Sequence, residues 1–191
     1  DATGAYVLCD CTGYRLDGTD TEPGMYVGII VNRSLADTTD SVTGLGDIHA
    51  LVNAIGEMRR VAREAGFIAI KVDDIAEVNA RFGFDAGDRV LAESAACLMD
   101  CSRGKGRLFR STGPTFVALF DELGPEAIDE IASDIERFLG SPVLIGSLEY
   151  QPPIRVATLH LDGVDRQPVS ILNELKALLG KAVQVPGTKL D

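Results

Sequence analysis

The stretch from Phe67 to Phe120 constrains the fold of this chain more than any other. It begins with FIAIKVDD, in which apolar residues alternate with small or polar ones, and this period of two is typical of a β-strand with one buried face. A short helix is expected after Asp74, ending near Gly83, and a longer helix is expected from Asp85. Two more strand-like runs, GRLFRS and TFVALF, flank a turn-forming Thr-Gly-Pro. The sequence therefore predicts the order strand, helix, helix and hairpin.

The rest of the chain supplies further helices and strands around this unit. Amphipathic patterns predict helices over about 47–65, 125–139 and 168–181. Strand-like runs cover 142–150 and 153–162. Strands that alternate with helices and include a hairpin indicate an α+β fold, in which a mixed central sheet is flanked by helices.

The chain divides into four segments by composition and pattern. They are an N-terminal β-hairpin over 1–33, a linker and lead-in over 34–46, the α+β domain over 47–182 and a tail over 183–191. The hairpin consists of two strand-like runs around the turn-rich segment DGTDTEPG, and two strands alone do not make an independent domain. The chain opens on aspartate rather than methionine, so we expect a piece of a longer protein.

Charge and hydropathy exclude several classes of function. The 191 residues carry a formal net charge of −11, which argues against nucleic acid as a partner, because phosphate backbones bind basic surfaces. No apolar run reaches the ~20 residues that a membrane helix needs. We therefore expect no membrane segment in this piece and a cytoplasmic location.

The cysteines and histidines have no pattern typical of a catalytic or metal site. The cysteine spacings are Cys9-x-Cys11 and Cys97-x-x-x-Cys101, which favour buried reduced thiols over a zinc site. The two histidines, His49 and His160, fall on a predicted helix and a predicted strand. We expect both to be structural.

The residues of the central stretch resemble the signature of GGDEF domains. The matching residues are Asn79, Phe82, Gly83, Asp85, Gly87, Asp88, Val90, Leu91, Arg110 and Phe116. Residues 40–45, Asp-Ser-Val-Thr-Gly-Leu, are similar to the family's D-x-L-T-G-L lead-in, and the resemblance covers roughly 40–182. It implies the palm-like sheet of nucleotide cyclases. Family members with intact motifs are diguanylate cyclases, which join two GTP molecules into cyclic di-GMP with two magnesium ions.

The hairpin before this lead-in resembles the closing strands of a PAS sensor domain. The alternative is that the hairpin is a β-extension specific to this GGDEF domain. The sequence alone favours neither interpretation. A sensor arrangement implies a bacterial-type signalling protein that acts through a protein partner, or through a homodimer formed by its sensor domains.

The motif that names the family is replaced in this chain. The residues at the Gly-Gly-Asp-Glu positions and at the metal-binding aspartate of the first strand are Thr112, Gly113, Pro114, Thr115 and Lys71. Ala76 stands where the family has a phosphate-contacting lysine. Magnesium needs carboxylate or water oxygens, which neither an ammonium group nor a proline provides. The resemblance therefore implies a catalytically inactive regulatory or interaction domain with no cofactor and no resident metal.

The base-recognition residues are retained. Asn79 and Asp88 align with family residues that hydrogen-bond guanine, so the resemblance implies GTP or another guanine nucleotide as a ligand. A purely structural role is the alternative, because asparagine near a helix end and aspartate in a first helical turn need no ligand. The last helix has a family counterpart with a phosphate-contacting lysine, and Lys181 fits only one of three alignments.

Two alternatives concern the lost carboxylates and the family's inhibitory site. An active cyclase would need Asp73 or Asp74 to take over magnesium binding, whereas we expect Lys71 to pair with one of these aspartates and close the site. The inhibitory site of the family reads R-x-x-D. Arg103 matches its arginine but Gly106 replaces its aspartate, so we expect weak or no binding of cyclic di-GMP.

Overall fold

The computed structural model describes residues 38–61, 64–102, 104–139, 142–163 and 166–188, with the backbone alone at 59–61, and the backbone of two strands before them. The chain divides into two units, Asp1–Thr38 and Thr39–Asp191. In the first unit, β1 (Cys9–Leu16) pairs antiparallel with β2 (Met25–Asn32), as the sequence predicts. Whether this pair ends a PAS domain stays a prediction.

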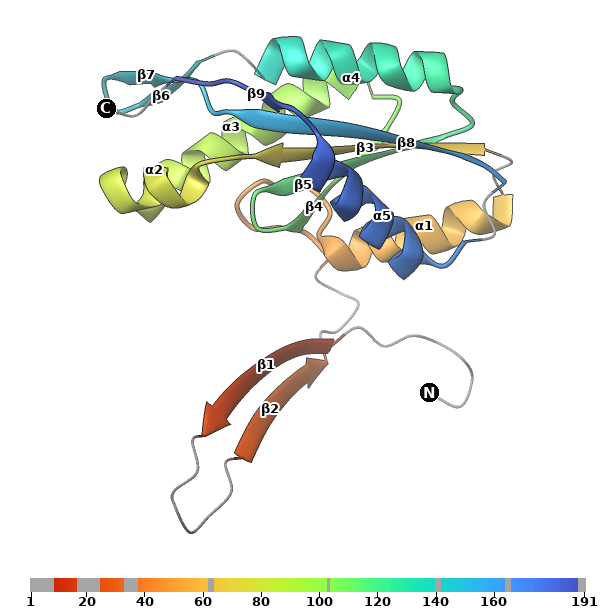
Figure 1. The fold of residues 1–191 in the computed structure, drawn as a ribbon, viewed down its shortest axis with the longest axis horizontal. Coiled ribbons are helices and arrows are strands. Elements are labelled where there is room, and N and C mark those ends of the chain that lie inside the picture. Colours follow the sequence, from red (N-terminus) through yellow and green to blue (C-terminus); the bar gives the residue numbers. More distant parts are fainter. Residues whose placement is uncertain are drawn as a thin grey trace. The chain divides into compact units, whose positions relative to one another are not determined.

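The second unit is a five-stranded sheet with helices on both faces (Figure 1). The strand order is β4-β5-β3-β8-β9, where β3 is Glu64–Val72, β4 Arg107–Thr112, β5 Thr115–Asp121, β8 Ile154–Asp162 and β9 Gln184–Val185. One face is covered by α1 (Ile48–Val61) and α5 (Pro168–Lys181). The other face carries α2 (Ile75–Phe82), α3 (Phe84–Ser102) and α4 (Pro125–Leu139).

The sheet connects its strands mainly in antiparallel fashion. All four neighbouring strand pairs are antiparallel, and a parallel bridge joins Gly46 of the lead-in to Phe109 of β4. The predicted fold class, α+β with a mixed sheet flanked by helices, is confirmed. Among the described helices, none combines the length and the apolar character that a membrane crossing requires.

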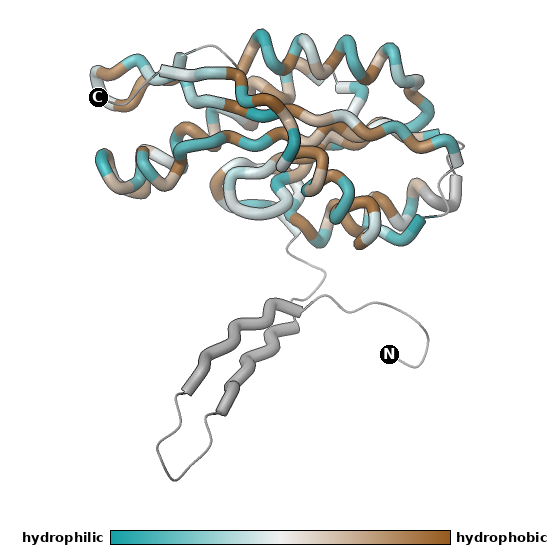
Figure 2. Tube along the Cα trace, viewed as in Figure 1, coloured by the Kyte–Doolittle hydropathy of each residue, from teal (hydrophilic) through white to brown (hydrophobic). Residues whose placement is uncertain are grey.

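Alternation along β3 explains why helices cover both faces of the sheet. Ile68 and Ile70 belong to the apolar cluster with α3 and α4, whereas Phe67 and Ala69 belong to the cluster with α1 and α5. All four side chains are fully buried. Figure 2 shows hydrophobic residues along the central strands and hydrophilic residues recurring along the helices. Burial of both faces therefore makes β3 the centre of the core.

Three elements differ from the sequence prediction. The helix predicted to about residue 65 ends at Val61, because the chain from Glu64 onward pairs with β8. The single strand expected over 142–150 is a hairpin of β6 (Val143–Ile145) and β7 (Leu148–Tyr150), reversed at Gly146 with φ 63°. The residues expected as a tail include β9, which adds an edge strand to the sheet.

Candidate functional site

The positions of the family motif come together at one end of the sheet. Lys71 of β3 lies opposite Thr115 of β5 on one side and opposite Arg155 of β8 on the other. The backbone amide of Val72 donates to the carbonyl of Pro114 at 3.0 Å. The turn over residues 112–115, the motif turn, therefore lies directly beside the end of β3.

The Asp73 carboxylate is enclosed by donors from three parts of the chain. Lys71 Nζ lies 2.8 Å from Oδ1, while Arg155 Nε and Gln184 Nε2 donate to Oδ2 at 2.8 and 2.7 Å. Burial raises the pKa of Asp73, but the hydrogen bonds from these three side chains outweigh it and hold the pKa below its usual value. The expected pairing of Lys71 with an adjacent aspartate is confirmed, and the partner is Asp73.

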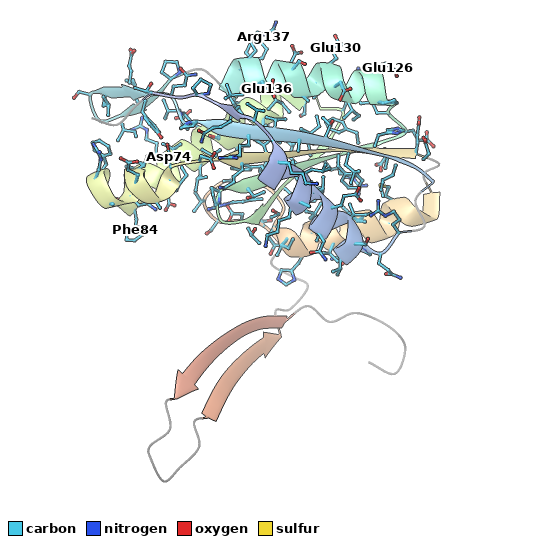
Figure 3. The ribbon with its side chains drawn as sticks, in the orientation of Figure 1. Asp74, Phe84, Glu126, Glu130, Glu136 and Arg137 are labelled. Carbon is cyan, nitrogen blue, oxygen red and sulfur yellow. The ribbon has the colours of Figure 1, made fainter. Side chains whose placement is uncertain are left out.

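Asp74 has a different environment from Asp73. It is exposed at the start of α2 (Figure 3), with a left-handed backbone, φ 62°, and makes no capping hydrogen bond through its side chain. Tyr150 of β7 is fully buried nearby, and its hydroxyl has no hydrogen-bond partner in the described part of the chain. Burial, with the negative charges of Asp74 and Glu77, raises the pKa of Tyr150 to about 12. Sequence reasoning missed Tyr150, because its run was interpreted as a single strand.

The motif turn is anchored to the lead-in segment by one arginine. Arg110 Nε donates to the carbonyl of Gly113 at 2.8 Å, and its Nη1 contacts both carboxylate oxygens of Asp40 at 3.0 and 3.1 Å. Burial raises the pKa of Asp40, but hydrogen bonds from Thr43 and Arg110 outweigh it and keep the pKa below its usual value. Gly113 has φ 54°, which a glycine adopts without strain. Thr112, next to it, is exposed.

The predicted guanine-recognition residues lie on adjacent helices, Asn79 on α2 and Asp88 in the first turns of α3. Asn79 Oδ1 is buried without a hydrogen-bond partner among the described residues. It lies against Gly87, where any Cβ would collide with the Asn79 amide. Asp88 is exposed, and Phe84 projects from the start of α3 with 78% of its surface exposed (Figure 3). That these two residues recognise a guanine base stays a prediction.

A cavity of about 470 Å³ lies under α5 beside the motif turn. Its basic lining residues are Lys71, Arg155 and Lys176, and its lining includes no aspartate or glutamate. Lys71 and Arg155 are paired with Asp73, but with that one negative charge counted the group still carries net positive charge, which favours an anion. Sequence reasoning considered Lys181 for the last helix and missed Lys176. The helical spacing from Leu172, which lines the same cavity, to Lys176 could have identified it.

The remaining predicted residues lie away from this end of the sheet or outside the described part. Arg103, the retained half of the inhibitory motif, is outside the described residues. A Cβ at Gly106 would collide with the ring of Phe120, so this position has no room for the family's aspartate. Burial raises the pKa of Cys97 on α3 to about 12, which keeps its thiol neutral. The side chains of Cys9 and Cys11 are also outside the described residues.

Comparison with curated proteins finds two partial relatives. The chain is 29% identical to cyclic di-GMP phosphodiesterase PdeR of Escherichia coli K12 over 119 residues. The matched region covers 61% of this chain and 18% of that protein. It is 29% identical over 84 residues to diguanylate cyclase DgcS of Shewanella oneidensis, covering 42% and 28%. The chain therefore spans only a minor part of the length of either relative.

Solved structures show the same fold. The GGDEF domain of FimX from Pseudomonas aeruginosa matches with a TM-score of 0.72 and 16% identity, over 77% of this chain and 94% of that one. The GGDEF domain of DgcB from Caulobacter crescentus, solved with c-di-GMP, matches with a TM-score of 0.69 and 16% identity, over 80% and 90%. Residues 37–156 match the sequence profile described as "Diguanylate cyclase, GGDEF domain". Because that match covers more than half of the chain, this protein belongs to the GGDEF domain family.

Proposed function

We propose that this chain carries a GGDEF domain that makes no cyclic di-GMP and serves as a regulatory or interaction module of a cytoplasmic signalling protein. The observation that carries the proposal is the state of Asp73. Its carboxylate, the acid nearest the end of β3, is already neutralised by Lys71 and Arg155 and hydrogen-bonded by Gln184. Both oxygens of this group already accept hydrogen bonds, so a metal ion that bridged Asp73 to a phosphate would have to compete with the charges of Lys71 and Arg155.

The two magnesium ions of the family's active members do not fit this site. The turn residues 112–115 carry no carboxylate, and the ammonium group of Lys71 occupies the position of the metal-binding aspartate. An ion placed there would lie among Lys71, Arg155 and Lys176, where like charge repels it. Phosphoryl transfer depends on metal charge between the phosphates, so the proposed domain has no means of stabilising that step.

A guanine nucleotide remains a suitable ligand in this proposal. Asn79 and Asp88 would hydrogen-bond the base, and the Asn79 amide, whose Oδ1 is now buried, would turn outward to accept from the exocyclic amine. The cationic cavity beside the motif turn would attract the phosphates without a metal ion. Binding without turnover is a suitable way for a signalling module to report nucleotide level, and a protein partner or a second copy would receive that signal.

The first test is catalytic. The full chain is incubated with GTP and either Mg²⁺ or Mn²⁺, and products are separated by chromatography. We expect no cyclic di-GMP above a control without protein, with DgcS as a positive control for the assay. Formation of cyclic di-GMP in proportion to protein concentration would establish the alternative, a cyclase with an altered metal site. Asp74 would be the acid to replace next, because it is exposed and not paired through a capping bond.

The second test measures nucleotide binding. Isothermal titration with GTP should give binding in EDTA at least as tight as in Mg²⁺, because Mg²⁺ neutralises part of the phosphate charge, and Asn79→Ala should weaken binding about tenfold through the loss of one base contact. Gly87→Ala should weaken it similarly, because its Cβ displaces the Asn79 amide, while stability changes by only about 1 kcal/mol.

Asn53→Ala is the matched control, since Asn53 is an exposed asparagine on α1 and should leave binding unchanged. ATP should bind less tightly than GTP if the base is recognised. Equal affinity for ATP and GTP, or binding unaffected by Asn79→Ala, would refute the guanine assignment.

A further inference from the structure

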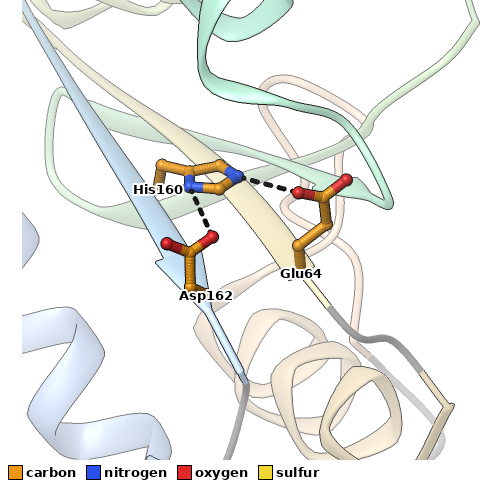
Figure 4. Close-up of side chains that lie close together, drawn as sticks. All are labelled: Glu64, His160 and Asp162. Carbon is orange, nitrogen blue, oxygen red and sulfur yellow. Dashed lines mark ion pairs between the residues drawn. The ribbon is translucent and has the colours of Figure 1, made fainter.

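Three side chains with metal-ligating atoms meet at the end of the sheet opposite to the motif turn (Figure 4). Glu64 begins β3, His160 and Asp162 lie near the end of β8, and the register places Glu64 directly opposite Asp162. His160 Nε2 lies 3.4 Å from Glu64 Oε2, and His160 Nδ1 lies 3.6 Å from Asp162 Oδ1. One ligand atom from each residue lies within 4.8 Å of the other two.

The contacts of the imidazole are compatible with a bound cation. A neutral imidazole has one N–H donor and one lone pair, whereas both nitrogens of His160 face a carboxylate. One nitrogen of the neutral ring must therefore direct its lone pair at a carboxylate oxygen. His160 Nε2 is buried and makes no hydrogen bond to any residue that the structure describes, although the Glu64 carboxylate lies beside it. A positive ion between the two would convert this unfavourable contact into two bonds.

We propose that Glu64, His160 and Asp162 form a binding site for one divalent transition-metal ion. At metal–ligand distances of about 2.1 Å, two ligand atoms in a tetrahedral site lie roughly 3.4 Å apart. The Nε2–Oε2 separation of 3.4 Å fits this value as it stands. Asp162 now lies beside the other ring nitrogen, Nδ1, and its side chain is 93% exposed, so its carboxylate is free to rotate away from Nδ1 and supply the third ligand, while water completes the shell.

The ligand set selects the class of ion. One imidazole nitrogen with two carboxylate oxygens suits Zn²⁺, Co²⁺ or Ni²⁺. Mg²⁺ prefers an octahedral shell of oxygens and keeps several of its waters, so it competes poorly for a nitrogen ligand. The net charge of −11 attracts cations of either kind, and the nitrogen ligand provides the discrimination.

This site is separate from the nucleotide site. Lys71 lies seven residues after Glu64 along the extended strand, which corresponds to roughly 23 Å. A metal ion here would take no part in chemistry at the motif turn. It would join the first residue of β3 to the end of β8 and hold the two central strands together.

The test is titration of the full chain with ZnCl₂ by calorimetry, followed by CoCl₂ with visible absorption. We expect one saturable site with a dissociation constant in the micromolar range, no response to MgCl₂, and Co²⁺ spectra without thiolate charge-transfer bands. His160→Gln and Glu64→Gln should each weaken Zn²⁺ binding at least tenfold. Glu64 is partly exposed, so its variant should fold even if the histidine variant does not.

His49→Gln is the matched control, because His49 is the other histidine of the chain and lies on α1. It should bind Zn²⁺ like the unmodified protein. In NMR spectra of the imidazole groups, only the His160 signals should shift on addition of Zn²⁺. No saturable binding below 1 mM, unchanged binding in Glu64→Gln, or thiolate bands with Co²⁺ would overturn the proposal.

Discussion

Replacing Lys71 by aspartate is expected to lower the free energy of unfolding by about 3 kcal/mol and to restore no cyclase activity. The new, shorter side chain would place a carboxylate on the same face as Asp73 and remove the ammonium group that now lies 2.8 Å from it. Attraction becomes repulsion, and the effect is below that of a fully buried pair because 44% of the Lys71 side chain is exposed. Urea denaturation at pH 7.5 measures the loss in stability, and chromatography of a GTP incubation measures activity.

Lys71→Ala separates the two components of this effect. It removes the attraction without adding repulsion, so it should cost only about 1 kcal/mol. Activity should stay absent in both variants, because Pro114 still supplies no carboxylate. If Lys71→Asp gained stability on addition of Mg²⁺ and produced cyclic di-GMP, the loss of function would rest on Lys71 alone and the proposed inactive role would be wrong.

Asp73→Asn is expected to lower the free energy of unfolding by about 2 kcal/mol at pH 7. The amide keeps the shape of the side chain but lacks the negative charge that now pairs with Lys71 and Arg155. The folded-state pKa of Asp73 lies below the unfolded value of about 3.9, so its contribution is fully present above that value and is lost as the pH falls through the folded-state pKa. The stability difference between the two proteins should therefore be constant from pH 7 to 5 and shrink below about pH 4.

Asp74→Asn is the control for this measurement. Asp74 follows Asp73 in the sequence, but its side chain is exposed and makes no capping hydrogen bond. Because asparagine tolerates the left-handed backbone of this position, stability should change by less than about 0.5 kcal/mol. Denaturation curves at several pH values would compare both variants with the unmodified protein. An equal loss in Asp74→Asn would show that general charge, rather than the enclosed carboxylate, sets the stability.

Apolar periodicity was sufficient to predict the longer elements. The helix predicted over 168–181 is observed at Pro168–Lys181, and that over 125–139 at Pro125–Leu139. Each presents one buried stripe to the sheet, so its period is visible in the sequence. The short strands were not predictable in this way. The run 142–150 is uniformly strand-like, and only the turn at Gly146 divides it. The two residues of β9 owe their strand conformation to pairing with β8.

The candidate site was predictable only where its residues are close in sequence. Lys71 and Asp73 share one face of a strand, so their pairing follows from the period of two. Arg155 and Gln184 are 82 and 111 residues from Asp73 in the sequence, and no local sequence pattern predicts contacts over such separations. The same limit hid the cluster of Glu64 and His160, which depends on the register of β3 against β8.

The enclosed carboxylate of Asp73 also determines how this end of the sheet responds to its surroundings. A protein that binds a dissociable counter-ion gains stability by mass action, in proportion to the logarithm of free ion over dissociation constant. Here the counter-charges are covalent parts of the chain, on Lys71 and Arg155. These groups cannot dissociate from the chain, so a chelator or a fall in magnesium concentration removes no counter-charge from Asp73. The stability of this end of the sheet therefore does not depend on the concentration of free magnesium, which metal-dependent phosphoryl transfer requires.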